Sequence, residues 1–221
     1  MQGLIFDFDG LITDTELPAF QTWQEIYQKY GCSLSLSTYA ACIGSPGAFD
    51  PHAHLESQIG RTLDREEVRA QRRQRYMALT EAQSLLPGVK DYMTEAKRLG
   101  LKLGIASSSP REWVVGHLMQ FGLDDYFDCI KCGDDATHVK PDPELYRLVL
   151  QTFNLPGDQV VALEDSPNGV LAAKRAGIFC VAVPNAVTRQ LSFDHADLQL
   201  ASLAAVSLAQ LLEQIRSDGH L

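Results

Sequence analysis

Residues 3–10 read Gly-Leu-Ile-Phe-Asp-Phe-Asp-Gly, an apolar run that ends abruptly in two aspartates and a glycine. The apolar residues predict a strand buried on both faces of a parallel sheet, and Gly10 permits a sharp change of backbone direction. We therefore expect Asp7 and Asp9 at the carboxyl end of this strand, the edge at which open α/β sheets bind ligands. Because two carboxylates this close repel each other, we also expect a cation beside them.

The composition is ordinary for a globular protein that has one large core, or a core and a smaller insertion. The chain has 221 residues, of which 45% are hydrophobic and 21% charged, and a formal net charge of −9. This charge argues against a nucleic-acid partner, since phosphate backbones are held mainly by Lys and Arg. No apolar segment approaches membrane-spanning length, and no basic region precedes the first apolar run, so we expect a cytoplasmic protein without a membrane partner.

The five cysteines are odd in number and scattered, which does not suggest a disulfide framework. Cys129 and Cys132 form a CxxC pair in a predicted strand, without a second pair at zinc-site spacing. This setting favours two thiols of the core over a metal or redox site.

Helices and strands alternate after residue 84. Strands are predicted at 101–106, 129–132, 160–163 and 179–183, and helices at 90–99, 110–121, 144–153, 167–176 and 203–215. Alternation of this kind predicts a parallel sheet, which the strand at 4–6 joins. Residues 16–83 show only helical spacing, as at Phe20, Trp23 and Tyr27. We therefore predict an α/β core made of residues 1–15 and 84–221, with an all-helical insertion at 16–83.

A run of serines follows the predicted strand at 101–106. Ser109 is predicted to cap the next helix, with Pro110 as its first residue. A serine run of this kind is usually only a cap, although the amides and hydroxyls of Ser107 and Ser108 also suit a phosphate group. The serine run alone therefore leaves phosphate binding open.

Lys140 stands just ahead of a predicted helix for which Asp142 is the N-cap and Pro143 the first residue. Capping does not need the lysine, and a lone lysine is usually surface charge. Beside Asp7, its ammonium would neutralise both the carboxylate and an incoming phosphoryl group.

The strand at 160–163 repeats the opening theme, because it ends in Glu164 and Asp165. Ser166 is predicted to cap the helix that begins at Pro167, so one acid could serve only the field of the helix N-terminus. Up to four carboxylates facing a phosphate require a hard divalent cation with oxygen ligands, and Mg²⁺ fits.

These stretches resemble, in order, the four motifs of the haloacid dehalogenase superfamily of phosphohydrolases. The motifs are Asp7-Phe-Asp9-Gly, Ser107, Lys140-Pro and Glu164-Asp165-Ser. The helical insertion directly after the first motif is similar to the β-phosphoglucomutase-like branch. The resemblance implies an α/β fold with a Rossmann-like parallel sheet and an inserted all-helical cap.

The resemblance also implies roles for the motif residues. Asp7 would be the nucleophile that forms an aspartyl-phosphate, and Asp9 the acid and then the base. Ser107, Ser108 and Lys140 would hold the phosphoryl oxygens.

The implied Mg²⁺ site consists of Asp7, the backbone carbonyl of Asp9, and Asp165. Glu164 would either bind the ion directly or lie behind the direct ligands.

The expected activity is Mg²⁺-dependent hydrolysis of a small phosphomonoester, with a sugar phosphate as first choice. Two alternatives stay open: a mutase of the β-phosphoglucomutase type, and a retired scaffold that senses phosphate or binds a partner. The mutase is disfavoured because an arginine follows the cap glycine in β-phosphoglucomutase, whereas residues 44–49 here read Gly-Ser-Pro-Gly-Ala-Phe. The retired scaffold is disfavoured because a binder would not need both Asp7 and Asp9.

Gly44, Ser45 and Arg72 are the candidate substrate contacts of the inserted helices. His52 and His54 are expected to be loop residues at the surface. His138 is placed at the pocket edge because it is close to Lys140. No apolar stripe is left unclaimed, so we expect a monomer.

Overall fold

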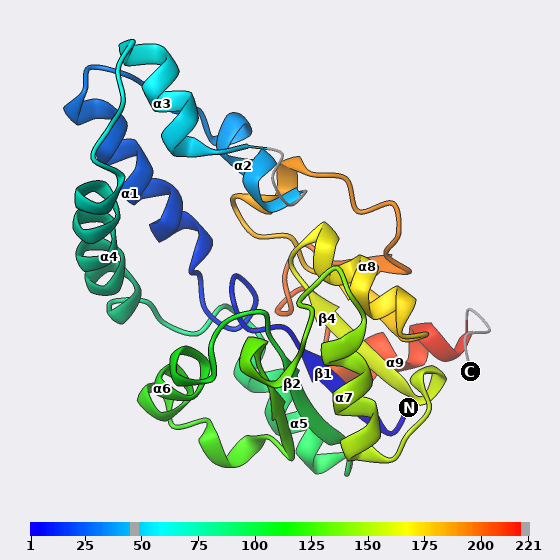
Figure 1. The fold of residues 1–221 in the computed structure, drawn as a ribbon. Coiled ribbons are helices and arrows are strands. Elements are labelled where there is room, and N and C mark those ends of the chain that lie inside the picture. The colour runs from blue at the N-terminus through cyan, green and yellow to red at the C-terminus, as the bar shows by residue number, and fades with distance from the viewer. Residues whose placement is uncertain (45–48, 218–221) are drawn as a thin grey trace.

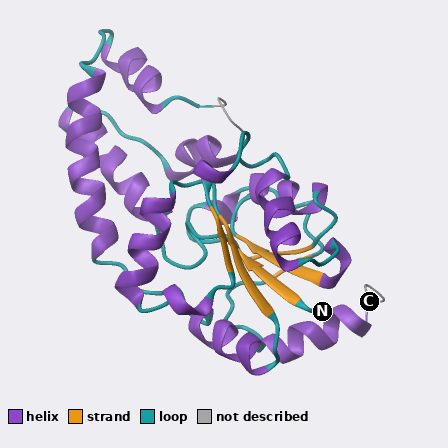
Figure 2. Ribbon diagram, turned by 60° about the horizontal axis from the view of Figure 1, so that its bottom comes forward, coloured by secondary structure: helices purple, strands orange, loops and turns teal. Residues whose placement is uncertain are grey.

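The structure, a computed structural model, describes residues 1–44 and 49–217. Within these residues the strands form one parallel sheet in the order β3-β2-β1-β4-β5-β6 (Figure 2). The strands are β1 (Gly3–Phe6), β2 (Lys102–Ala106), β3 (Cys129–Lys131), β4 (Val160–Glu164), β5 (Phe179–Ala182) and β6 (Leu198–Gln199). The fold class predicted from the sequence is confirmed.

The register of the sheet brings three strand ends to the same level. Phe6, the last residue of β1, lies opposite Ile105 of β2 and Leu163 of β4. The next residue, Asp7, is therefore level with the ends of both neighbouring strands, and its amide donates to the Leu163 carbonyl at 3.0 Å. The order places β1 inside the sheet, so its end has a neighbour on each side.

The sheet is covered on both faces by helices (Figures 1 and 2). They are α5 (Val89–Arg98), α6 (Arg111–Phe121) and α9 (Leu208–Ser217) on one face, and α7 (Glu144–Phe153) and α8 (Pro167–Arg175) on the other. Leu4 and Phe6 pack with the first group and Ile5 with the second, all fully buried. This alternation along β1 is the reason that its sequence is continuously apolar.

Between β1 and α5 the chain forms helices that stand apart from the sheet (Figure 1). They are α1 (Glu16–Lys29), α2 (Leu36–Gly44), α3 (Pro51–Ile59) and α4 (Arg65–Glu81). Their own apolar cluster includes Phe20, Trp23, Tyr27 and Leu55, so the aromatic stripe of α1 is helix core. We refer to α1–α4 as the inserted helices. That they form a domain with boundaries at 15/16 and 83/84 stays a prediction.

The two connections to the inserted helices lie side by side. Thr13 and Leu85 form an antiparallel bridge, and the Thr13 hydroxyl donates to the Ser84 carbonyl at 3.1 Å. The Leu86 amide donates to the Ile12 carbonyl at 2.9 Å. The entry and exit of the insertion are therefore tied together next to the end of β1.

Several predicted boundaries are wrong. The last helix begins at Leu208 rather than 203, because the Ser207 hydroxyl accepts from the Gln210 amide and caps the helix there. The short edge strand β6 was not predicted, since two residues carry no periodic signal. Helix α7 spans Glu144–Phe153 as predicted, but Pro143, expected as its first residue, is its N-cap instead, and Asp142 accepts from the Glu144 amide at 2.9 Å.

The expectation of loop histidines at the surface is also wrong. Asp50 caps α3, so both His52 and His54 lie on a helix. The His54 ring shares a hydrogen bond of 2.8 Å with the Tyr27 hydroxyl, and the His52 ring packs edge-on against Trp23 with centroids 4.7 Å apart. Both therefore belong to the packing of the inserted helices.

Across residues 1–44 and 49–217, no helix has both the length and the apolar character needed to cross a membrane. All five cysteines are free, and Cys129 and Cys132 are buried, as expected for thiols of the core.

Candidate active site

The centre of the site is an ion cluster at the carboxyl edge of the sheet. The Lys140 ammonium donates to Asp7 Oδ1 and, at 2.6 Å, to Glu164 Oε1. The Lys140 side chain is 6% exposed and that of Asp7 9%. The lysine is therefore no surface charge, and one ammonium bridges the ends of β1 and β4.

Glu164 is fully buried and held on both oxygens. Besides Lys140, Oε1 accepts from the Tyr146 hydroxyl at 2.5 Å, and Oε2 accepts from the Ser166 hydroxyl at 3.3 Å. A Cβ at Gly169 would lie 1.9 Å from Oε2, so only glycine allows α8 to approach this carboxylate. Ser166 also caps α8 as predicted, accepting from the Gly169 amide at 3.1 Å.

Asp165 lies beside these residues and is 2% exposed. Asn185, which follows β5, donates to Asp165 Oδ2 at 2.7 Å. Gly10 has φ +75°, and a Cβ there would lie 2.3 Å from the same oxygen. The glycine of the opening motif therefore both turns the chain and makes room for Asp165.

The charges of this cluster do not balance. Burial, and then the charges of Asp7 and Glu164, raise the pKa of Asp165 well above its usual value. Burial also raises the pKa of Asp7, against the opposing effect of Lys140. Conversely, the pKa of Lys140 is raised, because the two carboxylates outweigh the effect of its burial. A single ammonium thus faces three buried carboxylates.

A divalent cation would correct this imbalance. One oxygen from each of Asp7, Glu164 and Asp165 lies within 4.8 Å of the other two, all from buried residues. Clustered carboxylate oxygens with excess negative charge are a donor set that fits Mg²⁺. The Asp9 carboxylate is not a member of this group, which agrees with a role for its backbone carbonyl only.

The Asp9 carboxylate bonds to Trp113 of α6 and to Ser109, which comes just before α6. Its Oδ2 accepts from the Ser109 hydroxyl at 2.6 Å, and its Oδ1 accepts from Trp113 Nε1 at 2.9 Å. The prediction that Ser109 is a helix cap is therefore wrong: α6 begins at Arg111, whose amide donates to Asp134 Oδ2 at 2.5 Å. Because Asp134 supplies the cap from another segment, the Ser109 hydroxyl is free to bond Asp9.

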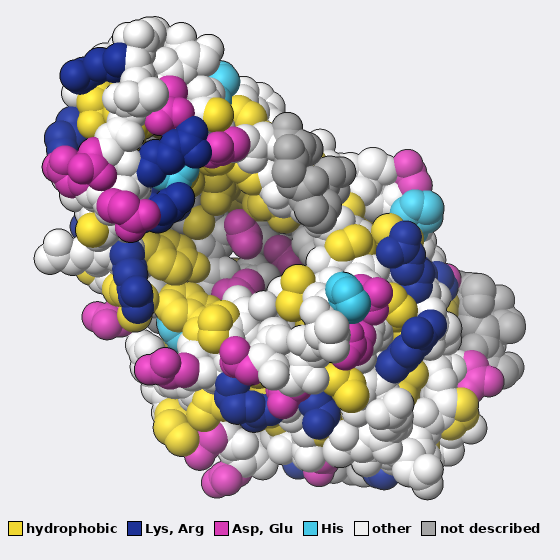
Figure 3. All heavy atoms as spheres, viewed as in Figure 1, with side chains coloured by type: hydrophobic (Ala, Val, Ile, Leu, Met, Phe, Trp, Pro, Cys, Tyr) yellow, Lys and Arg dark blue, Asp and Glu magenta, His cyan; other side chains and the backbone are white. Residues whose placement is uncertain are grey.

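A cleft of about 300 Å³ opens onto this edge. Figure 3 shows acidic side chains at the floor of the hollow between the inserted helices and the sheet. Asp7, Asp9, Ser108, Lys140 and Asp165 line it. These predicted residues are therefore brought together around one space.

Two predicted residues lie beneath the cleft rather than in its wall. Ser107 is 1% exposed, and its hydroxyl accepts from the Ser109 amide at 3.1 Å. Glu164 is fully buried, and it accepts a hydrogen bond from the Lys140 ammonium.

Glu16, the first residue of α1, also lines the cleft. Burial, with the charges of Asp9 and Asp14, raises its pKa to about 7. On the facing side, Asn168 of α8 donates to the Ile43 carbonyl of α2 at 2.9 Å and joins the two parts of the molecule across the cleft.

Among the candidate substrate contacts of the inserted helices, only Arg72 has a side chain that the structure describes, and it packs away from the acids. Gly44 ends α2, and Ser45 lies outside the described residues. The Arg72 guanidinium lies 3.9 Å from the centre of the Trp23 ring, and its Nε donates to the Thr22 hydroxyl at 3.3 Å. Arg72 is not among the described residues that line the acid cleft.

His138 does not lie at the pocket edge. Its side chain is 72% exposed and faces Glu144, with 3.7 Å between Nδ1 and Oε2. It too is absent from the lining of the cleft within the described part of the chain.

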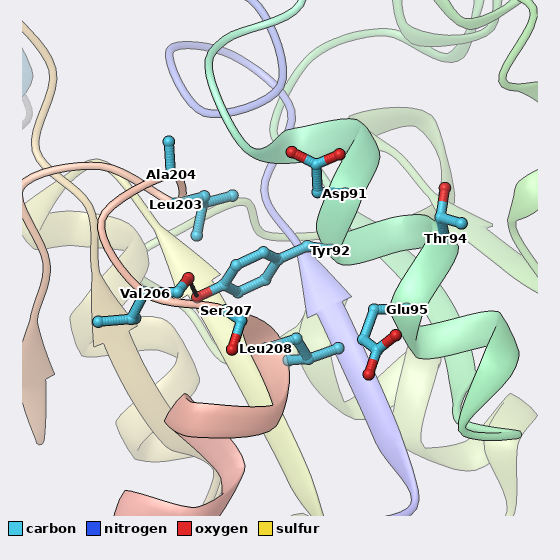
Figure 4. Close-up of a pocket in the computed structure, with 9 residues that line it drawn as sticks. All are labelled: Asp91, Tyr92, Thr94, Glu95, Leu203, Ala204, Val206, Ser207 and Leu208. Atoms are coloured by element: carbon cyan, nitrogen blue, oxygen red, sulfur yellow. Dashed lines mark hydrogen bonds between the residues drawn. The ribbon is translucent and has the colours of Figure 1, made fainter.

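A second hollow, of about 420 Å³, lies where α5 meets the segment before α9 (Figure 4). Its central contact is the Tyr92 hydroxyl, which donates to the Val206 carbonyl at 3.0 Å. Although it is larger than the acid cleft, its lining contains no lysine, arginine or histidine among the described residues. The chemistry of the side chains, not the volume, makes the acid cleft the candidate active site.

Sequence reasoning missed four residues of the site: Glu16 lines the cleft, and Asn185, Tyr146 and Trp113 donate hydrogen bonds to its acids. Asn185 carries a usable signal, because it follows a strand at the same edge of the sheet. Glu16 ends the motif-like run that begins at Asp7. Tyr146 and Trp113 carry none, because each lies within a helix that reads as ordinary apolar packing.

Comparison with known proteins agrees with this geometry. The haloacid dehalogenase-like hydrolase family matches residues 4–183. A protein of Bacillus subtilis (strain 168) described as "Putative phosphatase YhcW" is 46% identical over 218 residues, which is 99% of each chain. The phosphorylated carbohydrates phosphatase of Thermotoga maritima is 30% identical and covers 98% of this chain and 99% of its own.

A solved structure of a "putative beta-phosphoglucomutase" from Thermotoga maritima is 27% identical and has a TM-score of 0.77. It covers 97% of this chain and 100% of its own. The chain therefore belongs to the haloacid dehalogenase-like hydrolase family. Within that family it lies in the β-phosphoglucomutase-like branch, and the enzyme class predicted from the sequence, a phosphoric monoester hydrolase, is confirmed.

Proposed function

We propose that the chain is a Mg²⁺-dependent phosphatase that hydrolyses a small phosphorylated sugar. The observation that carries the proposal is the ion cluster, in which Lys140 bridges Asp7 and Glu164 at the floor of a cleft that Asp9 also lines. The similarity to a phosphorylated carbohydrates phosphatase over nearly the whole chain supports a sugar as the substrate class.

In the proposed reaction, an Asp7 oxygen attacks phosphorus and the bond from phosphorus to the sugar oxygen breaks. Asp9 donates its proton to the departing oxygen. Asp9 then accepts a proton from water, which attacks phosphorus and releases inorganic phosphate from Asp7. Protons and bonds balance over the two steps, and both carboxyl groups return to their initial states.

The phosphoryl oxygens are proposed to bind Lys140 and the serines after β2. Ser108 lines the cleft, while Ser107 lies beneath it. Glu164 accepts hydrogen bonds from the Lys140 ammonium and from the Tyr146 hydroxyl, so the ammonium is positioned before substrate arrives. Preorganised donors of this kind supply most of the stabilisation that phosphoryl transfer requires.

Asp7, Asp165 and the Asp9 carbonyl are proposed to hold Mg²⁺, with Glu164 acting mainly on Lys140. The ion would supply charge neutralisation at the phosphoryl oxygens.

The inserted helices are proposed to form a cap that selects the leaving group, with Gly44, Ser45 and Arg72 as its substrate contacts. Two observations support this proposal: Tyr76 of α4 lines the cleft, and Asn168 donates to the Ile43 carbonyl of α2. A monomeric, cytoplasmic enzyme stays a prediction.

The test is phosphate release from a panel of sugar phosphates, phosphoglycolate and nucleotides, with Mg²⁺ and with EDTA. We expect release from one or a few sugar phosphates and its loss with EDTA. Release that is insensitive to EDTA would contradict the metal, and release only from nucleotides would contradict the substrate class.

A mutase is the second candidate, favoured by the similarity to a structure described as a β-phosphoglucomutase. It is tested with β-glucose 1-phosphate and glucose 1,6-bisphosphate. Isomerisation without net phosphate release would replace the phosphatase proposal.

A further inference from the structure

The Asp9 carboxylate is held by two side chains to which the mechanism above gives no role. Trp113 Nε1 donates to Oδ1 at 2.9 Å, and the Ser109 hydroxyl donates to Oδ2 at 2.6 Å. A carboxylate anchored through both oxygens cannot rotate about its last bond without breaking one of these bonds. Its orientation is therefore set by α6 and the loop before it.

The indole is itself fixed in place. The ring of Tyr76 from α4 stacks on it, with centroids 5.5 Å apart and planes 15° apart. The ring of His117 lies 4.2 Å away, and His117 Nδ1 is 2.9 Å from the Trp113 carbonyl. An indole packed between two rings is a rigid donor, so its N–H holds one direction.

The donors reach Asp9 from the α6 side. Asp9 and Ser109 line both the acid cleft and a separate hollow of about 650 Å³ between α4 and α6, whereas Trp113 lines only the hollow. The Asp9 carboxylate thus lies at the boundary of the two spaces. The indole bond occupies the side away from the cleft, and the other side is open to substrate.

A carboxylate has about four acceptor sites, two on each oxygen. Trp113 takes one site of Oδ1, while the Ser109 hydroxyl at 2.6 Å and the Ser107 hydroxyl at 3.5 Å take the two sites of Oδ2. The second site of Oδ1 is left for the reaction. When Asp9 is protonated, the proton occupies this site, and the bonds from Trp113 and Ser109 persist. The same two donors can therefore orient Asp9 as acid and as base.

On this basis, and resting on the proposed phosphatase function, we propose that Trp113 and Ser109 are positioning residues that aim the acid–base carboxylate of Asp9 into the cleft. The effect of removing these two donors should depend on the pKa of the leaving oxygen. A leaving oxygen of high pKa needs a well-aimed proton, whereas a weakly basic one departs without help.

The experiment compares kcat/KM for a series of aryl phosphates whose leaving phenols have pKa values up to about 10, that of an ordinary phenol. This quantity reports the step in which the phenol departs. Trp113→Phe keeps an aromatic ring beside Tyr76 and removes the N–H. We expect kcat/KM to fall about 10-fold to 100-fold for phenyl phosphate and less than about 3-fold for p-nitrophenyl phosphate.

Trp23→Phe is the matched control, because it makes the same change in the inserted helices, where Trp23 packs on His52 and Arg72. Its dependence of kcat/KM on the pKa of the leaving phenol should equal that of the wild type. Equal losses for all esters in Trp113→Phe would show a merely structural role and overturn the inference, as would no change.

Ser109→Ala removes the shorter of the two bonds to Asp9 Oδ2 and gives an independent test if Trp113→Phe does not fold. It should also steepen the dependence on the pKa of the leaving phenol, and an unchanged dependence would count against the inference. A wild-type protein that releases no phosphate from any ester would instead refute the proposed function. The two failures are therefore distinguishable.

Discussion

The sheet edge and the inserted helices hold their charged side chains in opposite ways. At the sheet edge, Lys140, Asp7 and Glu164 have side chains 6%, 9% and 0% exposed. In the inserted helices, Arg75 pairs with Glu25 at 3.0 Å, but the two side chains are 52% and 46% exposed.

This difference in burial distinguishes charged side chains that have a proposed role in the reaction from charged side chains that only face solvent. Buried charges are costly even when paired, so a fold that keeps Lys140, Asp7, Glu164 and also Asp165 buried at one edge does so at the expense of stability. Exposed pairs contribute about 0–1 kcal/mol and are easily replaced. We infer that the sheet edge carries the reaction and that the inserted helices tune it.

The largest loss of activity is expected when the charge of Asp7, the proposed nucleophile, is removed. Asp7→Asn keeps the shape and removes the charge, so we expect kcat to fall by at least about 10⁴-fold. Phosphate release by the purified variant is the measurement, and Glu25→Gln, which also neutralises one acid, should stay near wild type. Substantial activity in Asp7→Asn would refute the mechanism.

A smaller effect tests whether the inserted helices have a core of their own. Leu55 is fully buried in their cluster, so Leu55→Ala should cost about 2–5 kcal/mol of the free energy of unfolding. Hydrogen exchange should show faster exchange in α1–α4, while the strand amides stay protected. Leu99→Ala, at a side chain 41% exposed, should change stability by less than about 0.5 kcal/mol. Equal loss of protection in the sheet would mean that the two parts unfold as one.

Glu16 is an intermediate case, because it is the first residue of α1 but lines the cleft together with the acids of the sheet edge. Its pKa is raised from 4.5 to about 7 in the folded protein, so the folded state binds more protons than the unfolded state between these pH values. Stability from this group is therefore present below pH 4.5 and lost as pH rises through 7.

Glu16→Gln removes the ionisable group and with it the loss of stability at high pH. In EDTA at pH 8 we expect the variant to be more stable than wild type by about 2 kcal/mol, after allowance for partial exposure of the side chain, with little difference at pH 4.5. Urea unfolding at both pH values measures this. An equal gain in the free energy of unfolding at pH 8 and at pH 4.5 would show that ionisation of Glu16 is not the cause.

The last prediction concerns substrate selection by the inserted helices, and its expected effect is the weakest of the four. If Arg72 contacts the sugar phosphate, Arg72→Met should raise KM for it about 10-fold, or about 1.4 kcal/mol, and leave kcat for p-nitrophenyl phosphate within about 2-fold. Arg69→Met, at a side chain 56% exposed, is the control. An unchanged KM would remove Arg72 from the proposed contacts.

The amino-acid sequence is enough to predict the parallel sheet and the edge at which the charged side chains meet. Continuous apolar runs followed by Asp7, Lys140 or Glu164 predict buried parallel strands and the segments that follow them, and the carboxyl ends of parallel strands share one edge. Residues far apart in the chain were therefore placed together without any knowledge of contacts. The helical character of the insertion followed from spacing in the same way.

The side chains that bond to the acids depend on how separate helices and loops pack together. Ser109 read as a cap, but Asp134 from another segment caps α6, and the Ser109 hydroxyl bonds Asp9 instead. Trp113 read as one more helix residue until the packing of α6 turned its N–H to Asp9. Periodicity sets the face on which a residue lies, whereas a hydrogen-bond partner depends on how separate elements pack, and that packing is not encoded in local spacing.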